Sequence, residues 1–291
     1  MPRIALVTCR PGPDVSTDRD LPVLAGAFEA AGAEARVVEW DDPDADWAGF
    51  DLAVIRSTWD YSWRVDAFLE WAERCGALTR LANPPEVVRW NTDKRYLGQL
   101  AAAGVPTVPT RYVAPGEPAG DLPDGHGYVV KPASGAGARL AARHRPGEHG
   151  AALAQLARMH AKGLTAMVQP YLGGIDVTGE RALQFFGGRL LHASRKDAVL
   201  TPGTPFDERK VAHPGLRPWT PTPAERDTAE KALAAVPGAP ELLYARVDLV
   251  DGADGEPVVM ELELVEPNLF LHLHPDSLPR LVEDTLAAAK A

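Results

Sequence analysis

Four charged side chains near the C-terminus have the types and the spacing of a divalent-cation site. They lie in the stretch ARVDLVDGADGEPVVMELELVEPN, residues 245–268. Alternate residues of a β-strand share a face, so Arg246 and Asp248 point the same way on a first strand. Glu261 and Glu263 likewise share a face on a second strand. The intervening DGADGE predicts that the two strands form an antiparallel hairpin.

Two registers of this hairpin are open. Symmetric closure of the loop on Asp251 and Glu256 sets Arg246 opposite Glu261, whereas a slip of two residues sets Asp248 opposite Glu261. Either register gathers the three carboxylates and the arginine on one face, while a slip of one residue would separate them. The other face of the second strand is expected to be apolar and to hold Met260, Leu262 and Leu264.

Three carboxylates at such spacing repel one another unless positive charge lies among them. A hard divalent cation bound by oxygen ligands alone suits Mg²⁺, or Mn²⁺, better than zinc. Without a cation, we expect the loss of one acid to relieve repulsion and stabilise the protein. The alternative is a solvated hairpin face on which charges are ordinary. Since Mg²⁺ usually bridges protein carboxylates to phosphates, the chain should also hold a phosphate site.

Composition narrows the classes of protein. The 291 residues carry a formal net charge of −10, which argues against nucleic-acid binding because phosphates need a basic surface. The two cysteines, Cys9 and Cys75, form no CxxC or Cys/His cluster, so neither a disulfide framework nor structural zinc is expected. No signal peptide and no membrane span are predicted. We expect a cytoplasmic, acidic, globular protein.

The pattern of elements predicts an α/β fold in three parts. Residues 1–90 alternate apolar strands with helices, which predicts an N-terminal parallel-sheet domain on the substrate side. Residues 91–172 are expected to form a central α+β lid subdomain that opens with a helix ending at Gly104. Residues 173–291 are expected to form a C-terminal antiparallel-sheet domain that includes the hairpin and a hairpin turning at Gly187-Gly188.

The stretch TPAERDTAEKALAAV predicts a helix with a clear start. Thr222, Pro223 and Glu225 form a capping box in which Thr222 is the N-cap and Glu225 the third helical residue.

A candidate phosphate site lies in VVKPASGAGA, where Lys131 ends a strand before a loop of small residues. Backbone N–H groups of residues 134–137 can approach an anion closely. There is no Walker A sequence, and GAGARL lacks the third glycine of a dinucleotide fingerprint. Taken alone, Lys131, Lys94 and the pair Arg195-Lys196 are equally compatible with solvated surface charges.

The order of these motifs resembles the ATP-grasp superfamily, which includes D-alanine–D-alanine ligase, glutathione synthetase and the cyclo-ligase that closes cycloserine. The matching motifs span most of residues 88–271. In chain order they are WNTDKRYLGQLAAAGVPTVPT, YVVKPASGAGA, MVQPYL, GERALQFFGGRLLHASRK, RVDLV and VVMELELVEP. No single motif is specific, and the resemblance depends on all six occurring in order.

The resemblance implies a role for each matching residue. ATP would be contacted by Lys94 and Lys131, covered by Ser134, Gly135, Ala136 and Gly137, and framed at the adenine by Gln169, Tyr171 and Leu172. Asp176 or Glu180 would hold the ribose. Two Mg²⁺ ions would be carried by Asp248, Glu261 and Glu263. Arg246, Arg195 and Lys196 would be catalytic. Many relatives have Asn in place of Glu263, which leaves Asn268 open as an alternative ligand.

The implied reaction is ATP-dependent ligation through an acyl-phosphate, which a nucleophile, usually an amine, displaces with release of ADP and phosphate. The partners would be a small amino-acid-like carboxylate and an amine, and a homodimer is possible. An intramolecular cyclo-ligase acting on an O-ureidoserine-like substrate is the alternative. A non-catalytic nucleotide-binding regulator and a nicotinamide oxidoreductase are disfavoured because every acidic position is filled and the glycine fingerprint is missing.

The substrate-side candidate is RSTWDYSWR, which follows a predicted strand of the first domain at the edge where open α/β sheets bind ligands. Arg56 has the charge to hold a carboxylate, and Trp59 and Tyr61 the size to shape a pocket, although packing is an equal alternative for the aromatic residues. The candidate substrate residues are Arg56, Thr58, Trp59, Asp60 and Tyr61. RSTWDY together with LELVEPN is most like the cycloserine cyclo-ligase subgroup.

Overall fold

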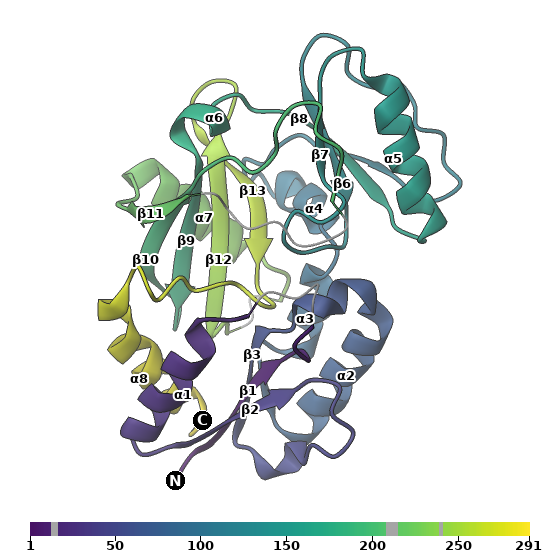
Figure 1. The fold of residues 1–291 in the computed structure, drawn as a ribbon. Coiled ribbons are helices and arrows are strands. Elements are labelled where there is room, and N and C mark those ends of the chain that lie inside the picture. Colours follow the sequence, from purple (N-terminus) through teal and green to yellow (C-terminus); the bar gives the residue numbers. More distant parts are fainter. Residues whose placement is uncertain (13–16, 208–214, 239–240) are drawn as a thin grey trace.

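Three separate β-sheets occupy successive parts of the chain (Figure 1). The computed structural model describes residues 1–12, 17–207, 215–238 and 241–291. The first sheet is parallel and the other two are antiparallel, which confirms the predicted fold class. Among the described helices, none is long and apolar enough to cross a membrane.

The N-terminal sheet has the strand order β2-β1-β3-β4. Its strands are β1 (Arg3–Thr8), β2 (Glu34–Glu39), β3 (Leu52–Ser57) and β4 (Arg80–Ala82). Its helices are α1 (Asp20–Ala30), α2 (Val65–Leu78) and the short 3₁₀ turns η1 (Trp47–Gly49) and η2 (Trp59–Trp63). β3 is buried along its whole length, as expected for a strand that is covered on both faces. Both cysteines are buried here and unpaired.

The central sheet has the order β5-β8-β6-β7 and is covered by one helix (Figure 1). These elements are β5 (Arg111–Val113), β6 (Tyr128–Pro132), β7 (Ala142–His144), β8 (Ala166–Pro170) and α5 (His149–Ala161). Buried apolar side chains of α5, among them Leu156 and Met159, pack on the sheet. The glycine-rich segment joins β6 to β7, as the sequence predicted.

The C-terminal sheet has the order β11-β10-β9-β12-β13. Its elements are β9 (Glu180–Phe186), β10 (Arg189–Lys196), β11 (Leu216–Trp219), β12 (Tyr244–Asp251), β13 (Pro257–Glu263), α6 (Ile175–Thr178) and α7 (Pro223–Ala234). Ala245, Val247 and Leu249 of β12 join the core that α7 covers. Strand alternation therefore turns Arg246 and Asp248 to the opposite face.

The helix predicted to open the second part of the chain at residue 91 begins later, as α4 (Tyr96–Ala102), and a separate helix, α3 (Pro85–Asn91), precedes it. Tertiary bonds separate the two helices. The Asn91 side chain donates to the Leu262 carbonyl and accepts from the Leu264 N–H, and the Lys94 N–H donates to the Ala133 carbonyl. Lys94 consequently lies in the turn between the two helices, and bonds from this turn to segments of both antiparallel sheets fix its position.

The chain ends meet beside the N-terminal sheet. The 3₁₀ turn η3 (Pro275–Ser277) leads into α8 (Leu278–Ala288), which lies next to α1 (Figure 1). Leu24 and Phe28 of α1 share a buried cluster with Leu281 of α8 and with Tyr244 of β12. This cluster joins the N-terminal and C-terminal sheets, and the segment between β13 and η3 runs along their junction.

Candidate active site

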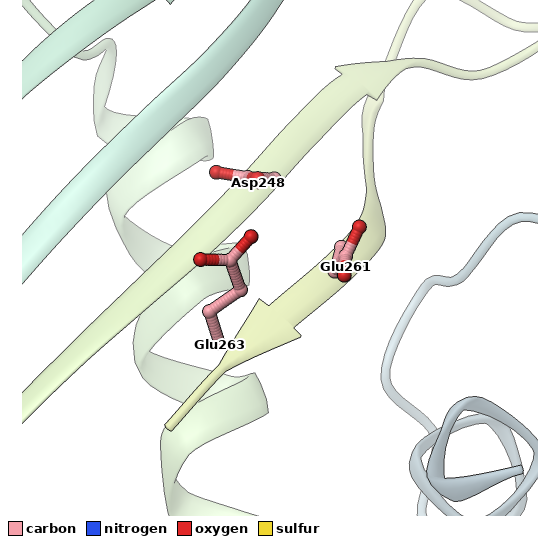
Figure 2. A group of neighbouring side chains, drawn as sticks. All are labelled: Asp248, Glu261 and Glu263. Carbon is pink, nitrogen blue, oxygen red and sulfur yellow. The ribbon is translucent and has the colours of Figure 1, made fainter. Parts of the chain in front are cut away.

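The three acidic side chains of the hairpin converge on one face of β12 and β13 (Figure 2). One oxygen from each of Asp248, Glu261 and Glu263 lies within 4.8 Å of the others. Asp248 is 1% exposed, while the side chains of Glu261 and Glu263 are each 22% exposed. The cluster is therefore buried at its base and accessible from the cavity that it lines.

The register of the hairpin is the second of the two predicted alternatives. Asp248 lies opposite Glu261 and Arg246 opposite Glu263, which excludes the alternative that sets Arg246 opposite Glu261. A β-bulge at Met260 explains the difference, because Leu249 pairs with Val259 on one side of it. If the pairing near the turn continued without a bulge, Glu261 and Glu263 would lie on the opposite face from Asp248. The extra residue brings the three acids onto one face. Met260 lines the cavity, contrary to its expected apolar placement.

Three cations neutralise the acids. The Arg246 guanidinium donates to both oxygens of Asp248 at 2.8 Å and also contacts Glu263. Lys196 donates to Asp248 at 2.7 Å, and the Lys94 ammonium lies 3.2 Å from Glu261. The repulsion that the sequence suggested is thus largely offset before any metal binds.

These contacts set the ionisation of the cluster. Burial alone would raise the pKa of Asp248, but Arg246 and Lys196 hold it well below its usual range. Burial, with the like charges of Glu261 and Asp248, raises the pKa of Glu263 to about 7, although Arg246 opposes the shift. Burial also opposes ionisation of Glu261, but Lys94 and Lys131 lower its pKa, so Asp248 and Glu261 are both held in the charged form. This set of hard oxygen donors fits Mg²⁺.

The lysines and the loop surround the same cavity of about 680 Å³. Lys94 donates to the Gly135 carbonyl at 2.6 Å, which ties the turn before α4 to the β6–β7 loop. Burial lowers the pKa of Lys131 to about 8, although Glu261 opposes the shift. The backbone of Gly135, Ala136 and Gly137 lines the cavity, whereas Ser134 does not. The geometry thus places two lysines and an amide-rich loop beside the acids.

The residues predicted to hold adenine and ribose divide into two groups. Gln169, Tyr171, Leu172 and Glu180 line the cavity, and Glu180 is in contact with Lys196. Asp176 does not line it. Its carboxylate accepts from the Tyr171 hydroxyl at 2.6 Å and pairs with Arg143 at 3.0 Å, so Glu180 is the better placed of the two ribose candidates.

The neighbouring Arg195 and Lys196 diverge because successive residues of a strand point to opposite faces. Lys196 faces the acids, whereas Arg195 donates to the Val177 carbonyl of α6 at 2.6 Å. The structure contradicts the predicted catalytic placement of Arg195. Arg246 and Lys196 are the cations that meet Asp248.

The substrate-side segment contributes one side chain to the cavity. Trp59 lines it. Tyr61 stacks on Phe68 in the core, and Asp60 accepts from the Trp40 indole at 2.9 Å, so both side chains are held in the packing of the first domain and neither lines the cavity. Thr58 is completely buried. Arg56 is also buried and donates to the Pro267 carbonyl at 3.0 Å, behind the cavity wall.

Several lining residues were absent from the predicted site. Asp20 lies outside the predicted motifs, Arg139 directly follows the glycine-rich loop, and Glu266 and Phe270 belong to the segment after β13, which also holds the predicted alternative ligand Asn268. Phe270 has a left-handed backbone, with φ of 54°, and its ring lies 5.7 Å from the Arg246 guanidinium. Such backbone in a bulky residue is uncommon. It was the EPN run that pointed to this segment, and Asn268 remains a candidate ligand.

Comparison with known proteins decides the family. A family model described as the N-terminal domain of D-cycloserine synthetase DcsG matches residues 4–83. The cycloserine biosynthesis protein DcsG of Streptomyces lavendulae is 37% identical over 281 residues, which cover 91% of this chain and 92% of that protein. The chain belongs to the DcsG family of ATP-grasp ligases.

Solved structures agree with this membership of the DcsG family. The crystal structure of D-cycloserine synthetase DcsG matches with a TM-score of 0.87 and 34% identity, over 99% of each chain. D-alanine–D-alanine ligase from Bacillus anthracis, complexed with ATP, matches with a TM-score of 0.66 and 17% identity, over 100% of this chain and 99% of that one. The second likeness shows the fold alone. As a DcsG-like ATP-grasp ligase, the chain forms C–N bonds, so the oxidoreductase alternative is wrong.

Proposed function

We propose that this ligase is an ATP-dependent cyclo-ligase of the cycloserine type, which closes a ring within a small O-ureidoserine-like amino acid. One observation carries the proposal. The acids, both lysines, the glycine-rich loop and Trp59 of the N-terminal sheet line a single cavity of about 680 Å³. That volume suits a nucleotide with one small second substrate.

The nucleotide would enter between the central and C-terminal sheets. Gln169, Tyr171 and Leu172 would frame the base, and Glu180 would accept from the ribose. Lys94 and Lys131 would meet the phosphates, which the backbone of residues 135–137 would cover. A lysine whose pKa lies near 8 when the site is empty becomes fully protonated beside a polyphosphate, which strengthens this contact.

Mg²⁺ held by Asp248, Glu261 and Glu263, with Asn268 as a further candidate, would neutralise charge on the transferring phosphoryl group. Arg246 is positioned by Asp248 and Glu263. Its guanidinium, together with Lys196, would orient the substrate carboxylate toward the γ-phosphate. Preorganised charges of this kind stabilise a transition state because no reorganisation is needed during the reaction.

The chemistry proceeds in two balanced steps. A carboxylate oxygen attacks the γ-phosphorus, the bond to ADP breaks, and an acyl-phosphate forms. A nitrogen of the same molecule then attacks the acyl carbon, the C–N bond forms, inorganic phosphate leaves, and the nitrogen loses its proton. Holding both groups in one cavity supplies proximity worth about 7–11 kcal/mol in the best cases. The loop over the cavity would limit hydrolysis of the acyl-phosphate by water.

The ring-closing version is favoured over joining of two molecules by the 37% identical relative, which is a cycloserine biosynthesis protein. A phosphate-release screen tests the choice. The enzyme with Mg-ATP is offered O-ureidoserine, single amino acids, amino-acid pairs and dipeptides. Release of ADP and phosphate with O-ureidoserine alone is expected. Turnover that requires a separate amine would contradict ring closure, and tight Mg-ATP binding without turnover on any compound would favour a regulator.

A further inference from the structure

Arg139 connects the glycine-rich loop to the N-terminal part of the chain. Its Nη2 atom donates to the Ser62 carbonyl at 3.0 Å and lies 3.4 Å from the Ser62 hydroxyl. Its guanidinium carbon lies 5.0 Å from the centroid of the Trp63 ring. Ser62 and Trp63 belong to η2, whose first residue, Trp59, lines the cavity. Arg139 is buried and lines the same cavity, so this contact lies at the cavity wall.

The 3₁₀ turn that accepts from Arg139 is itself held from two sides. Tyr61 of η2 stacks on Phe68 of α2 in the core of the N-terminal domain. The Trp59 indole donates to the Glu266 carbonyl at 3.4 Å, which ties η2 to the segment after β13. Arg139 therefore attaches the loop to a fixed part of the molecule.

Two further bonds hold the ends of the loop. The Leu140 N–H donates to the Asp207 carbonyl at 2.7 Å, and the Leu140 side chain is buried in the core that α5 covers. At the other end, the Lys94 ammonium donates to the Gly135 carbonyl at 2.6 Å. Phosphate oxygens of ATP would compete with that carbonyl for Lys94. Arg139 is therefore the tie that remains once a nucleotide occupies Lys94.

The backbone on both sides of Arg139 depends on these bonds. Ala138 and Leu140 have left-handed backbones, with φ of 57° and 58°. Such backbone is uncommon outside glycine and persists only where the surrounding structure holds it. Loss of the contact between Arg139 and η2 should therefore release the loop.

We propose that Arg139 is a positioning residue that holds the glycine-rich loop closed against η2, and that the closed loop keeps water from the acyl-phosphate. The second part rests on the proposed function. In the side reaction that the loop prevents, a water oxygen attacks the acyl carbon, the bond from that carbon to the phosphate oxygen breaks, inorganic phosphate leaves, and the water loses its proton. The carboxylate is regenerated, and one ATP is consumed without a new C–N bond.

Hydrogen exchange measures the tie independently of turnover. The backbone amides of residues 134–140 are followed by mass spectrometry in enzyme saturated with Mg²⁺ and a non-hydrolysable ATP analogue. Arg139→Met is expected to exchange at least about tenfold faster there than the wild type, because a hydrogen bond from a charged donor is worth about that factor. Arg139→Lys, which keeps a charged donor, is expected to lie between the two. Exchange at the wild-type rate in Arg139→Met would overturn the tie.

Arg145→Met is the matched control. Arg145 follows β7 in the same subdomain and also donates to a main-chain carbonyl, that of Pro202 at 3.3 Å, but it is exposed and does not line the cavity. Its loop exchange and turnover are expected to equal those of the wild type. Loop exchange as fast as in Arg139→Met would overturn the assignment to Arg139.

An unchanged circular dichroism spectrum and retained binding of the Mg²⁺-loaded analogue establish that Arg139→Met is folded. Loss of analogue binding in this folded variant would make Arg139 a direct phosphate ligand and overturn its positioning role.

The ratio of phosphate released to ring product formed tests the exclusion of water. With O-ureidoserine and Mg-ATP, the wild type is expected to release about one phosphate for each ring, and Arg139→Met at least about three. A ratio that stays at one in Arg139→Met, with both products reduced in proportion, would overturn the exclusion of water by this loop. No phosphate release by the wild type would contradict the cyclo-ligase, and faster loop exchange in Arg139→Met would still support the tie.

Discussion

Asp248 is the side chain on which the other charges of the site depend. Its two oxygens accept from Arg246 and one of them also accepts from Lys196, deep in the sheet. Arg246 in turn contacts Glu263. This network fixes the positions of Arg246 and Lys196 and leaves Glu261 and Glu263 facing the cavity.

Replacing either cavity-facing acid should remove turnover without unfolding the protein. In Glu261→Gln and in Glu263→Gln the shape of the side chain is kept, but the charge that attracts Mg²⁺ is lost. We expect ATP turnover with substrate present to fall at least about 100-fold, since even outer-sphere partners of a metal are worth 10- to 100-fold. Phosphate release measured over a range of Mg²⁺ concentrations gives the result.

Glu256→Gln provides the control, because Glu256 is exposed in the loop of the same hairpin. Its turnover should stay within about twofold of wild type. Full activity in both Glu261→Gln and Glu263→Gln would show that these acids hold no essential metal.

Asp248→Ala should destabilise the metal-free protein. Repulsion among the acids alone would predict the opposite, but removal of Asp248 takes one carboxylate from two buried cations and leaves Arg246 with Glu263 and Lys196 with Glu180. Breaking a buried pair in this way costs about 3–5 kcal/mol. Urea denaturation in the presence of a chelator measures the change, and a stability equal to or above wild type would contradict the ion-pair account.

At the scale of elements, the junction between β10 and the C-terminal segment depends on a pair of histidines. The rings of His192 and His274 stack with centroids 4.1 Å apart. Nε2 of His192 donates to the Leu269 carbonyl, and the Ser277 hydroxyl donates to Nδ1, both at 2.8 Å. These bonds hold the segment that carries Phe270 against the sheet.

This pair predicts a loss of stability in mild acid. Burial and the neighbouring His274 lower the pKa of His192 to about 4, whereas an unfolded histidine titrates near 6.5. The unfolded state therefore binds the proton first, and stability is present above pH 6.5 and declines as the pH falls toward 4. The contribution at pH 5 is about 2 kcal/mol smaller than at pH 8.

Urea denaturation of the wild type and His192→Gln at both pH values checks the sign. The variant is expected to lose less stability between pH 8 and pH 5 than the wild type does. An identical loss in the two proteins would mean that His192 does not titrate on unfolding.

Local chemistry made several elements predictable. The capping box of α7 is present as expected, with Thr222 accepting from the Glu225 N–H. The Gly187-Gly188 turn joins β9 to β10, and both glycines have positive φ. The bulge at Met260 and the break before Lys94 were not predictable, because bonds between distant segments set them and local propensity does not.

At the scale of the whole molecule, all three sheets contribute to one cavity. The sequence located the groups that a motif carries, namely the acids, the two lysines and the glycine-rich loop. It did not locate Asp20, which lines the cavity from the start of α1 and carries no motif. It also placed Arg195 in the site, because the sequence of the Arg195-Lys196 pair does not show which of the two side chains faces the cavity.

We propose above that this site uses the γ-phosphoryl group of ATP to activate a carboxylate. Isotope transfer tests it most directly. O-Ureidoserine labelled with ¹⁸O in its carboxylate is incubated with the enzyme and Mg-ATP, and the released phosphate is examined by mass spectrometry. The account predicts one ¹⁸O in each phosphate, because a carboxylate oxygen attacks the γ-phosphorus and stays with it. Phosphate released without label would contradict an acyl-phosphate and with it the proposed ligase mechanism.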